Sequence, residues 1–209
     1  MHESINASRD DTPRIRPESP MQPAMRRRAP YARLMTFGMR TTTEPPRKKE
    51  TAMDAIQLLK KDHVTVRGLL DELETTTPRG LKKRTELIAR IARELKAHTT
   101  IEEEIFYPAF KAAARKGDDS KMFFEATEEH RAAGDLVLPD VLSTDPRSEK
   151  FSGRAKVLKE MIEHHAKEEE KDMFPRAKEL LSKEELLALG DQMAARKQQL
   201  LAANGRMPG

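Results

Sequence analysis

The chain has 209 residues, of which 35% are Asp, Glu, Lys or Arg and only 4% are aromatic, and it contains no Cys. The absence of Cys excludes disulfides, thiolate metal sites and thiol catalysis. No apolar run approaches the roughly 18–20 residues that cross a bilayer, and the N-terminus lacks the apolar core of a secretory signal. We therefore expect a cytoplasmic protein with no membrane partner.

The charge is unevenly distributed. Residues 1–50 hold seven of the 13 prolines and have 11 basic and 6 acidic residues, a net charge of +5, whereas the remainder has 28 basic and 29 acidic residues, a net charge of −1. The remainder is thus not basic, which argues against a nucleic-acid partner. Residues 1–50 show no helical or strand period, so we predict a disordered tail there. The alternatives are a translation start at Met53 and a basic arm that contacts acidic surfaces.

From residue 51 onward, apolar residues recur at steps of three and four, which predicts amphipathic helices. In the first helix the stripe is Ile56, Leu59, His63, Val66, Leu70 and Leu73. Thr51 and Asp54 are expected to form a capping box at its start. Thr77-Pro78 is expected to begin the second helix, whose stripe is Leu87, Ile91, Leu95, His98, Glu102 and Ile105.

A Gly-Asp-Asp turn at 117–119 is expected to open the third helix, whose inward residues are Phe123, Thr127, His130 and Val137. Asp145-Pro146 is expected to begin the fourth helix, with the stripe Leu158, Ile162, His165, Glu169 and Met173. We expect Pro108 and Pro175 to kink or end their helices. Ser182 with Glu185 should cap a fifth, mostly polar helix that ends near Ala203.

The fold class is therefore predicted to be all-α. Short connections force neighbouring helices to be antiparallel, so residues 51–181 should form an up-down-up-down four-helix bundle. Residues 182–209 then form an additional C-terminal helix and tail, which lies across the bundle or mediates self-association. We expect a monomer or a weak homo-oligomer.

An internal repeat relates the two halves of this bundle. A shift of 67 residues carries His63 onto His130, His98 onto His165, and Glu102 onto Glu169. On a helix, His at position i and Glu at position i+4 share one face. Four helices would thus present four imidazoles and two carboxylates to a common centre, which indicates a dinuclear metal site.

A structural His–Glu network is the alternative to a metal site. Buried imidazoles and carboxylates are costly unless they are paired or bound to metal, and helix packing gives no reason to collect six of them in one layer. A mixed set of imidazole and carboxylate ligands suits two iron ions, with manganese or zinc as weaker alternatives. Two bridging carboxylates and two imidazoles per ion would leave room for O2, peroxide or another small ligand.

These motifs resemble a known family. Asp-His at 62–63, His-x3-Glu-Glu with a following Pro at 98–108, Glu-His at 129–130, and a second His-x3-Glu-Glu with Pro at 165–175 are similar to the hemerythrin-like HHE cation-binding domains. The resemblance covers about residues 53–180 and implies a four-helix bundle around a non-haem diiron centre. By position, the implied ligands are His63, His98, Glu102, His130, His165 and Glu169.

The chain departs from oxygen-carrying hemerythrins at two positions. Those proteins have a second His one turn after the third-helix ligand, where this chain has Gly134. They also have an Asp late in the fourth-helix motif, where this chain offers Glu169 or Glu170. These departures argue against reversible O2 carriage and favour a more open, more reactive or ion-holding centre.

Four further residues have two readings each. His164 and Glu168 also stand at i and i+4, but they are rotated by about 100° from His165 and Glu169, so we expect His164 to be exposed. Glu103 and Glu170 are expected to be hydrogen-bond partners of the ligand imidazoles. Tyr107 is either an aromatic residue at the core boundary or a group at the edge of the site.

The sequence thus predicts a diiron protein that holds iron and engages O2 or a related small molecule. One alternative is an enzyme that decomposes peroxide or acts as an oxidase at the same centre. Another is an interaction protein that responds to metal or oxygen.

Overall fold

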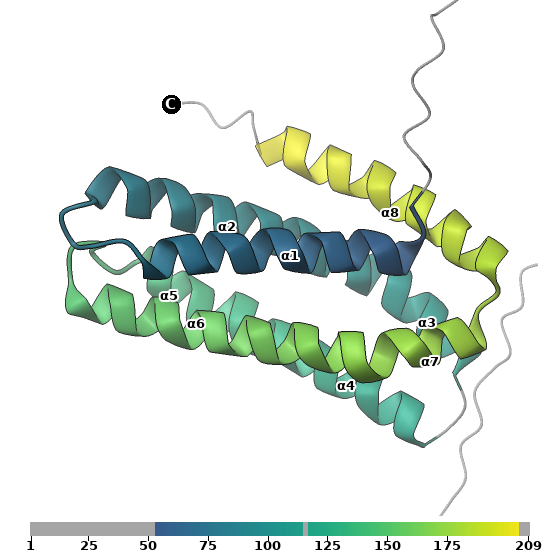
Figure 1. Ribbon diagram of the computed structural model, residues 1–209. Coiled ribbons are helices and arrows are strands. Elements are labelled where there is room, and N and C mark those ends of the chain that lie inside the picture. The colour runs from purple at the N-terminus through teal and green to yellow at the C-terminus, as the bar shows by residue number, and fades with distance from the viewer. Residues whose placement is uncertain (1–52, 115–116, 205–209) are drawn as a thin grey trace, which may run out of the picture. The chain divides into compact units, whose positions relative to one another are not determined.

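The computed structural model describes residues 53–114 and 117–204, and all regular elements in these ranges are helical (Figure 1). The prediction of an all-α fold is thereby confirmed for the described residues, which form a helical bundle. The long helices are α1 (Ala55–Glu74), α2 (Leu81–Ile101), α4 (Asp118–Arg131), α6 (Glu149–Glu168) and α8 (Lys183–Asn204). None of the helices in these ranges has an apolar stretch long enough to span a membrane. The predicted disordered tail at 1–50 lies outside the described residues.

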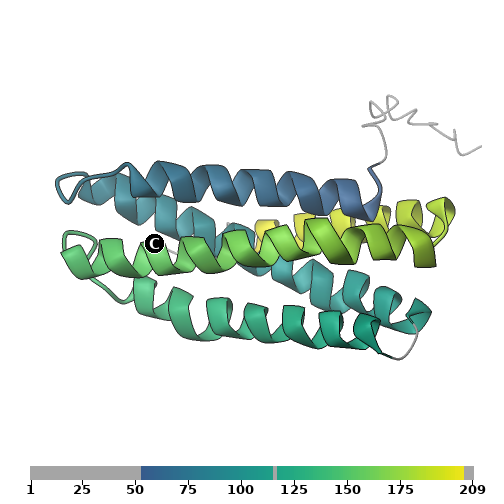
Figure 2. The same cartoon turned by 60° about the horizontal axis from the view of Figure 1, so that its bottom comes forward.

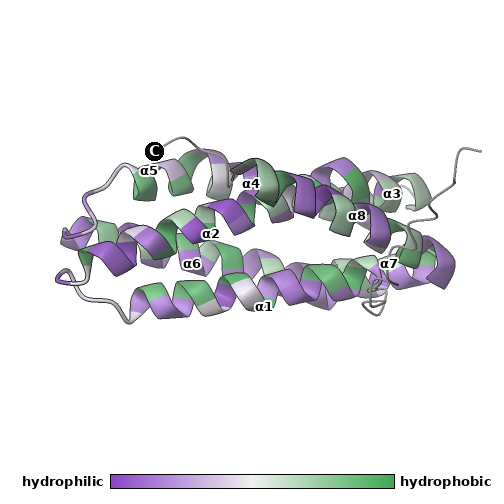
Figure 3. Ribbon diagram, turned by 90° about the horizontal axis from the view of Figure 1, so that it is seen from above, coloured by the Kyte–Doolittle hydropathy of each residue, from purple (hydrophilic) through white to green (hydrophobic). Residues whose placement is uncertain are grey.

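Helices α1, α2 and α6 pack against one another, α4 packs against α6, and all four run along one direction of the bundle (Figures 1 and 2). Each long helix carries hydrophilic and hydrophobic residues along its whole length, as the hydropathy colouring shows (Figure 3). This distribution is what an amphipathic helix with one buried face requires.

Three helical paths contain a π-helical segment followed by a further α-helix. The pairs are η1 (Glu102–Phe106) with α3 (Tyr107–Ala113), η2 (Ala132–Val137) with α5 (Leu138–Leu142), and η3 (Glu169–Met173) with α7 (Phe174–Leu180). In each pair the second residue of the α-helix is a proline, at 108, 139 or 175. The wider turn before it closes with an i→i−5 bond, for example from Tyr107 N–H to Glu102 O.

The expectation that Pro108 and Pro175 kink or end their helices needs correction. Proline lacks an N–H and clashes with the carbonyl four residues earlier in a regular α-helix. The π-helical turn accommodates this clash, so the helical path continues through Pro108 to Ala113 and through Pro175 to Leu180. The distortion that the sequence predicts is therefore a π-bulge and not a helix end.

Several predicted helix starts are shifted. Asp54 is itself the N-cap of α1 and forms its capping box with Gln57, while Thr51 lies outside the described residues. Helix α2 begins at Leu81, after the turn that contains Pro78. Helix α6 begins after Ser148, whose hydroxyl accepts the Phe151 N–H, and not at Asp145-Pro146. In both cases the proline lies in the preceding turn.

Other predicted helix starts are confirmed. Gly117 has a φ of 112°, which favours glycine, and directly precedes α4. The capping box of α8 is also present: the Ser182 hydroxyl accepts the Glu185 N–H, and the Glu185 carboxylate accepts the Ser182 N–H.

The buried apolar residues form two separate clusters. One contains the N-terminal half of α1, the end of α2, α3, α7 and part of α8, and the other contains the C-terminal half of α1, most of α2, α5 and the first part of α6. Along each of α1, α2, α4 and α6, a buried histidine stands between the residues of the two clusters. The polar layer of the bundle is thus enclosed by apolar packing on both sides.

Helix α8 packs across α1, α2 and η1, so it lies across the bundle as one of the two alternatives predicted. Met193 is fully buried and Leu186 nearly so. Gly190 allows the close approach, because a Cβ there would lie 2.2 Å from the Met53 carbonyl oxygen. The chain therefore fixes α8 against the start of α1 by backbone contact.

We expect Gly190→Ala to lower the free energy of unfolding by about 1–3 kcal/mol, the usual range for overpacking, because backbone atoms of α1 must move to admit the methyl group. Gly153→Ala is the matched control, since nothing lies within 4 Å of a Cβ at that helical position. The control should raise stability by about 0.5–1 kcal/mol. Urea unfolding measures both, and equal stability of the Gly190 variant and the wild type would contradict the docking of α8.

Candidate metal centre

The structure brings all six predicted ligand residues into one buried cluster. Their side chains come from the four helical paths at the level between the two apolar clusters, and each is at most 6% exposed. They fall into two groups whose potential ligand atoms lie within 4.8 Å of one another: one of His63, His98, Glu102 and Glu169, and one of Glu102, His130 and His165. Glu102 belongs to both groups, which is the arrangement that a carboxylate bridging two ions requires.

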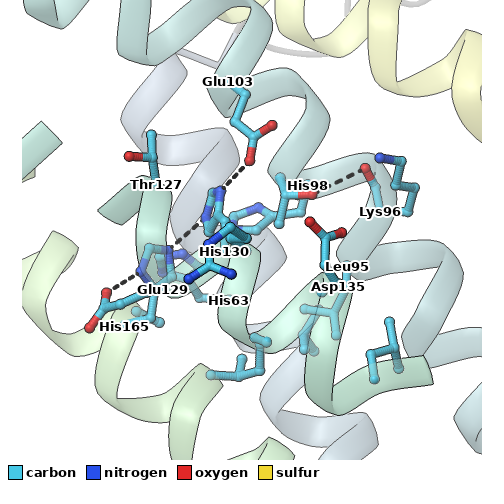
Figure 4. Close-up of a pocket in the computed structure, with 18 residues that line it drawn as sticks. His63, Leu95, Lys96, His98, Glu103, Thr127, Glu129, His130, Asp135 and His165 are labelled. Carbon is cyan, nitrogen blue, oxygen red and sulfur yellow. Dashed lines mark hydrogen bonds and ion pairs between the residues drawn. The ribbon is translucent and has the colours of Figure 1, made fainter. Parts of the chain in front are cut away.

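The Nε2 atoms of the four histidines face the centre of the cluster. His63 Nε2 lies 3.2 Å from Glu169 Oε2, and His98 Nε2 lies 3.3 Å from Glu102 Oε2. His130 Nε2 also lies 3.3 Å from Glu102 Oε2, and only 2.9 Å from His165 Nε2. Four ring nitrogens thus converge on two carboxylates, and Figure 4 shows the four rings gathered at the base of a cavity.

The Nδ1 atom of each ring faces a carboxylate on the outside of the cluster. His63 pairs with Glu170 at 2.9 Å, His130 with Glu103 at 2.9 Å, and His165 with Glu129 at 2.8 Å. His98 faces Asp62 at a longer 3.6 Å. An ionised carboxylate accepts a proton from Nδ1, so a neutral ring then carries its lone pair on Nε2.

Sequence reasoning identified two of these outer carboxylates and missed the other two. Glu103 and Glu170 were predicted as partners of the imidazoles, and the structure shows these contacts. Asp62 and Glu129 were not assigned a role. The repeat contained the signal, because the shift of 67 residues also carries Asp62 onto Glu129.

The contacts obey the same approximate twofold relation as the sequence. The shift of 67 residues converts the pair His98–Asp62 into His165–Glu129. Applied to one residue and reversed for the other, it converts His130–Glu103 into His63–Glu170. The two halves of the chain therefore build equivalent halves of the site.

Two departures from this symmetry distinguish the halves. The hydroxyl of Tyr107 donates to Glu169 Oε1 at 2.8 Å and lies 3.3 Å from His130 Nε2, whereas the equivalent residue, Phe174, stacks on His63 without a polar group. Tyr107 thus lies within the site. Arg67 binds Glu170 at 2.9 Å, whereas its equivalent is Gly134.

The electrostatics of the cluster favour positive charge at its centre. Burial and the neighbouring Glu169 raise the pKa of Glu102 well above its usual range. Burial alone would raise the pKa of Glu169 as well, but His165 and His63 outweigh it and hold this pKa below its usual range. Burial lowers the pKa of His98 to about 4. Two carboxylates buried side by side can both ionise only where a cation compensates them.

Several atoms at the centre have no hydrogen-bond partner among the described residues. They are both carboxylate oxygens of Glu102, Oε2 of Glu169 and Nε2 of His63. A buried polar atom without a partner is costly, and these four are oxygens and an imidazole nitrogen of the kind that bind metal ions. The donor set therefore fits a metal ion.

A cavity of about 390 Å³ opens onto this cluster and touches all four histidines. Apolar residues line much of it, among them Val66, Leu95, Ile162 and Leu138, and Lys96 and Arg131 lie on its wall. Gly134 also lines the cavity, and no atom lies within 4 Å of a Cβ placed there. The position where oxygen-carrying hemerythrins have a further His is thus open space beside His130.

His164 does not belong to the buried cluster. Its side chain is 63% exposed, and its Nε2 lies 3.2 Å from Glu168 and 3.6 Å from Glu129. The expectation of an exposed His164 is confirmed, which supports the helix phase assigned to His165.

Comparison with known proteins gives the same assignment. The model of the hemerythrin HHE cation binding domain matches residues 54–177. The protein Rv2633c of Mycobacterium tuberculosis is 33% identical over 149 residues, which cover 71% of this chain and 88% of that protein. A DNA nickase of Nostoc is 26% identical over 133 residues, which cover 64% of this chain but only 36% of the nickase.

A solved structure agrees with these matches. The crystal structure of a hemerythrin HHE cation binding domain-containing protein from Mycobacterium kansasii, a homologue of Rv2633c, superimposes with a TM-score of 0.63 at 32% identity. The match covers 72% of this chain and 89% of that one. This chain therefore belongs to the hemerythrin HHE cation-binding domain family.

Proposed function

We propose that the protein is a non-haem diiron protein of hemerythrin-like type, which holds two iron ions and engages O2 or a related small molecule. The ions would be held within an up-down-up-down four-helix bundle. One position would use His63 and His98, the other His130 and His165, and Glu102 and Glu169 would lie between them. The observation that carries the proposal is the orientation of the four rings, whose Nε2 atoms face the centre while their Nδ1 atoms face carboxylates.

The charge around the rings supports two divalent ions in preference to one. Six carboxylates contact or face the imidazoles: Asp62, Glu102, Glu103, Glu129, Glu169 and Glu170. Arg67 and Lys197 pair with two of them. Four negative charges remain when all six are ionised, and two divalent cations would neutralise them.

An iron pair in this position would supply the capacity to bind and reduce O2 or peroxide. The residues of the chain would orient and shield it. The outer carboxylates hold the rings in the Nδ1–H form, and the two apolar clusters restrict the access of water to the cavity. Tyr107 offers one hydroxyl proton beside Glu169 and His130.

Tyr107 is the specific observation that favours the alternative of an enzyme. Burial and then Glu102 raise the pKa of Tyr107 well above its usual range, so the hydroxyl keeps its proton. A protonated hydroxyl at the centre can donate a hydrogen bond or a proton to a bound ligand. Peroxide decomposition or oxidase chemistry would use such a group, whereas simple ion storage would not.

The proposal is tested by metal analysis of protein purified without chelator. We expect about two iron ions per chain, with absorption bands of a carboxylate- or oxo-bridged pair. Spectra recorded before and after addition of O2 and of peroxide then separate binding from turnover. One zinc ion per chain would contradict the diiron proposal, as would a protein that binds no metal.

We expect Gly134→Leu to weaken the binding of azide, a small anionic probe, at least tenfold without changing iron content. The leucine side chain would occupy the open space of the cavity beside His130. Gly68→Leu is the control, because Gly68 is exposed on α1 and nothing lies within 4 Å of a Cβ there. Spectroscopic titration measures the affinity. Equal azide affinity of the Gly134 variant and the wild type would show that ligands do not use this cavity.

A further inference from the structure

A second cavity reaches the cluster from a different side. It has a volume of about 100 Å³ and lies between α4 and the segment α6–η3. Five carboxylates line it: Glu125, Glu129, Glu168, Glu169 and Asp172. We call it the acidic cavity. At its inner end are His165 and Glu169, and the Oε2 atom of Glu169, which lacks a hydrogen-bond partner, belongs to a side chain that is 2% exposed.

A group of potential ligands stands at the outer end. Glu129, His164 and Glu168 each offer one ligand atom, and these atoms lie within 4.8 Å of one another. Glu129 connects this group to the interior, because one of its oxygens lies 3.6 Å from His164 while the other accepts from His165 at 2.8 Å. A cation held at the outer group would therefore be separated from the buried ring of His165 by a single carboxylate.

The approximate twofold relation provides an internal comparison for this feature. The shift of 67 residues places Leu58, Ala97, Ile101 and Ile105 at the positions equivalent to Glu125, His164, Glu168 and Asp172. Leu58, Ala97 and Ile101 are buried, and Leu58, Ile101 and Ile105 belong to the apolar packing that includes α8 residues. The equivalent face is thus apolar and covered by α8.

The carboxylate equivalent to Glu129 is also blocked on that side. Asp62 Oδ1 lies 2.6 Å from the ammonium group of Lys197, a residue of α8. A cation that approaches Asp62 would have to displace this lysine. The site of the bundle that is symmetric in its ligands is therefore asymmetric in its access, with an acidic face at α4 and α6 and a closed face under α8.

We propose that the acidic cavity is the route by which divalent metal ions reach the buried cluster, with Glu129, His164 and Glu168 as the transient docking position at its mouth. This inference rests on the proposed function. A cleft lined by one sign of charge raises the local concentration of counter-ions and their rate of association. The larger cavity has Lys96 and Arg131 on its wall, which suits it to small anionic or neutral ligands. Metal ions and small ligands would thus use separate paths.

The test measures how fast metal-free protein takes up ferrous iron in anaerobic stopped-flow mixing. We compare the wild type with the triple variant Glu125→Gln, Glu168→Gln and Asp172→Asn, none of which is a proposed ligand of the buried cluster. We expect loading to be about tenfold slower in the variant, the lower end of the range for electrostatic steering, and its dependence on ionic strength to be weaker. The final iron content should be unchanged.

A matched control removes the same charge elsewhere. Glu72→Gln, Glu86→Gln and Glu160→Gln alter three exposed carboxylates that do not line the acidic cavity. This control should load within about twofold of the wild-type rate, since only the overall charge changes. Circular dichroism and melting curves show whether each variant is folded.

The outcomes separate this inference from the proposed function. Equal loading rates of the triple variant and the control would overturn the acidic cavity as the route while leaving the diiron proposal intact. A lower final iron content in the triple variant would also overturn it, since these residues would then be ligands and not a path. A wild type that takes up no metal would refute the proposed function and this inference with it.

Discussion

Replacing either His98 or His165 with alanine is expected to reduce the iron content from about two ions per chain to one or fewer. Each ring is buried, and its Nε2 atom faces a shared carboxylate: His98 lies 3.3 Å from Glu102, and His165 lies 3.4 Å from Glu169. Loss of even a hydrogen-bond partner of a metal ligand typically costs about 10–100-fold in affinity, so loss of the ligand itself should cost more.

His164→Ala is the matched control for that change. His164 is adjacent in sequence to His165 but 63% exposed, so its loss should leave the iron content at equilibrium unchanged. Elemental analysis of the three purified variants provides the measurement. If His164→Ala lost metal while His165→Ala retained it, the alignment of the two repeats and the assigned helix phase would both be wrong.

Removal of the metal is expected to lower the melting temperature by about 8–16 °C. A ligand that binds only the folded state stabilises it by about 4 kcal/mol at a free concentration of about 1,000 times its Kd. For a domain of this size, each kcal/mol corresponds to roughly 2–4 °C. The metal-free protein also retains Glu102 and Glu169 side by side, which is unfavourable because burial and mutual repulsion oppose their ionisation.

The stability measurement compares chelated protein with protein reloaded with ferrous iron under anaerobic conditions. The lost melting temperature should be recovered on reloading. His98→Ala serves as the control, since the difference between its chelated and reloaded forms should be much smaller. Identical melting of the chelated and reloaded wild-type protein would argue against a metal site within the core.

The positions of the six clustered residues could be predicted because they follow from two local rules. A His and a Glu four residues apart share a helix face, and the apolar stripe shows which face is buried. His165 could be distinguished from His164 on this basis alone, and the exposure of His164 confirms the choice. The repeat added the correspondence between the two halves, including the outer pairs of Glu103 and Glu170.

The features that could not be predicted depend on backbone geometry or on distant contacts. Pro108 and Pro175 were expected to disturb their helices, but a sequence does not show that a π-helical turn will absorb each proline. That turn also affects Tyr107. In a π-helical turn, residue i+5 is bonded back to residue i, so Tyr107 follows Glu102 onto the buried face and contacts Glu169.

The docking of α8 was also beyond sequence reasoning. Its apolar residues form only a weak stripe, and two placements were compatible with them. The close contact of Gly190 with the start of α1 and the pairing of Lys197 with Asp62 both require a residue far away in the sequence. Neither contact produces a local pattern, and together they close one face of the centre.

The central claim is that two metal ions lie in the buried layer and share Glu102. Anomalous diffraction at the iron absorption edge, from crystals of the iron-loaded protein, tests it most directly. We expect two peaks per chain, one beside His63 and His98 and the other beside His130 and His165, with the carboxylate of Glu102 reaching both. A single peak in this layer, or iron found only at the exposed group around His164, would contradict the claim.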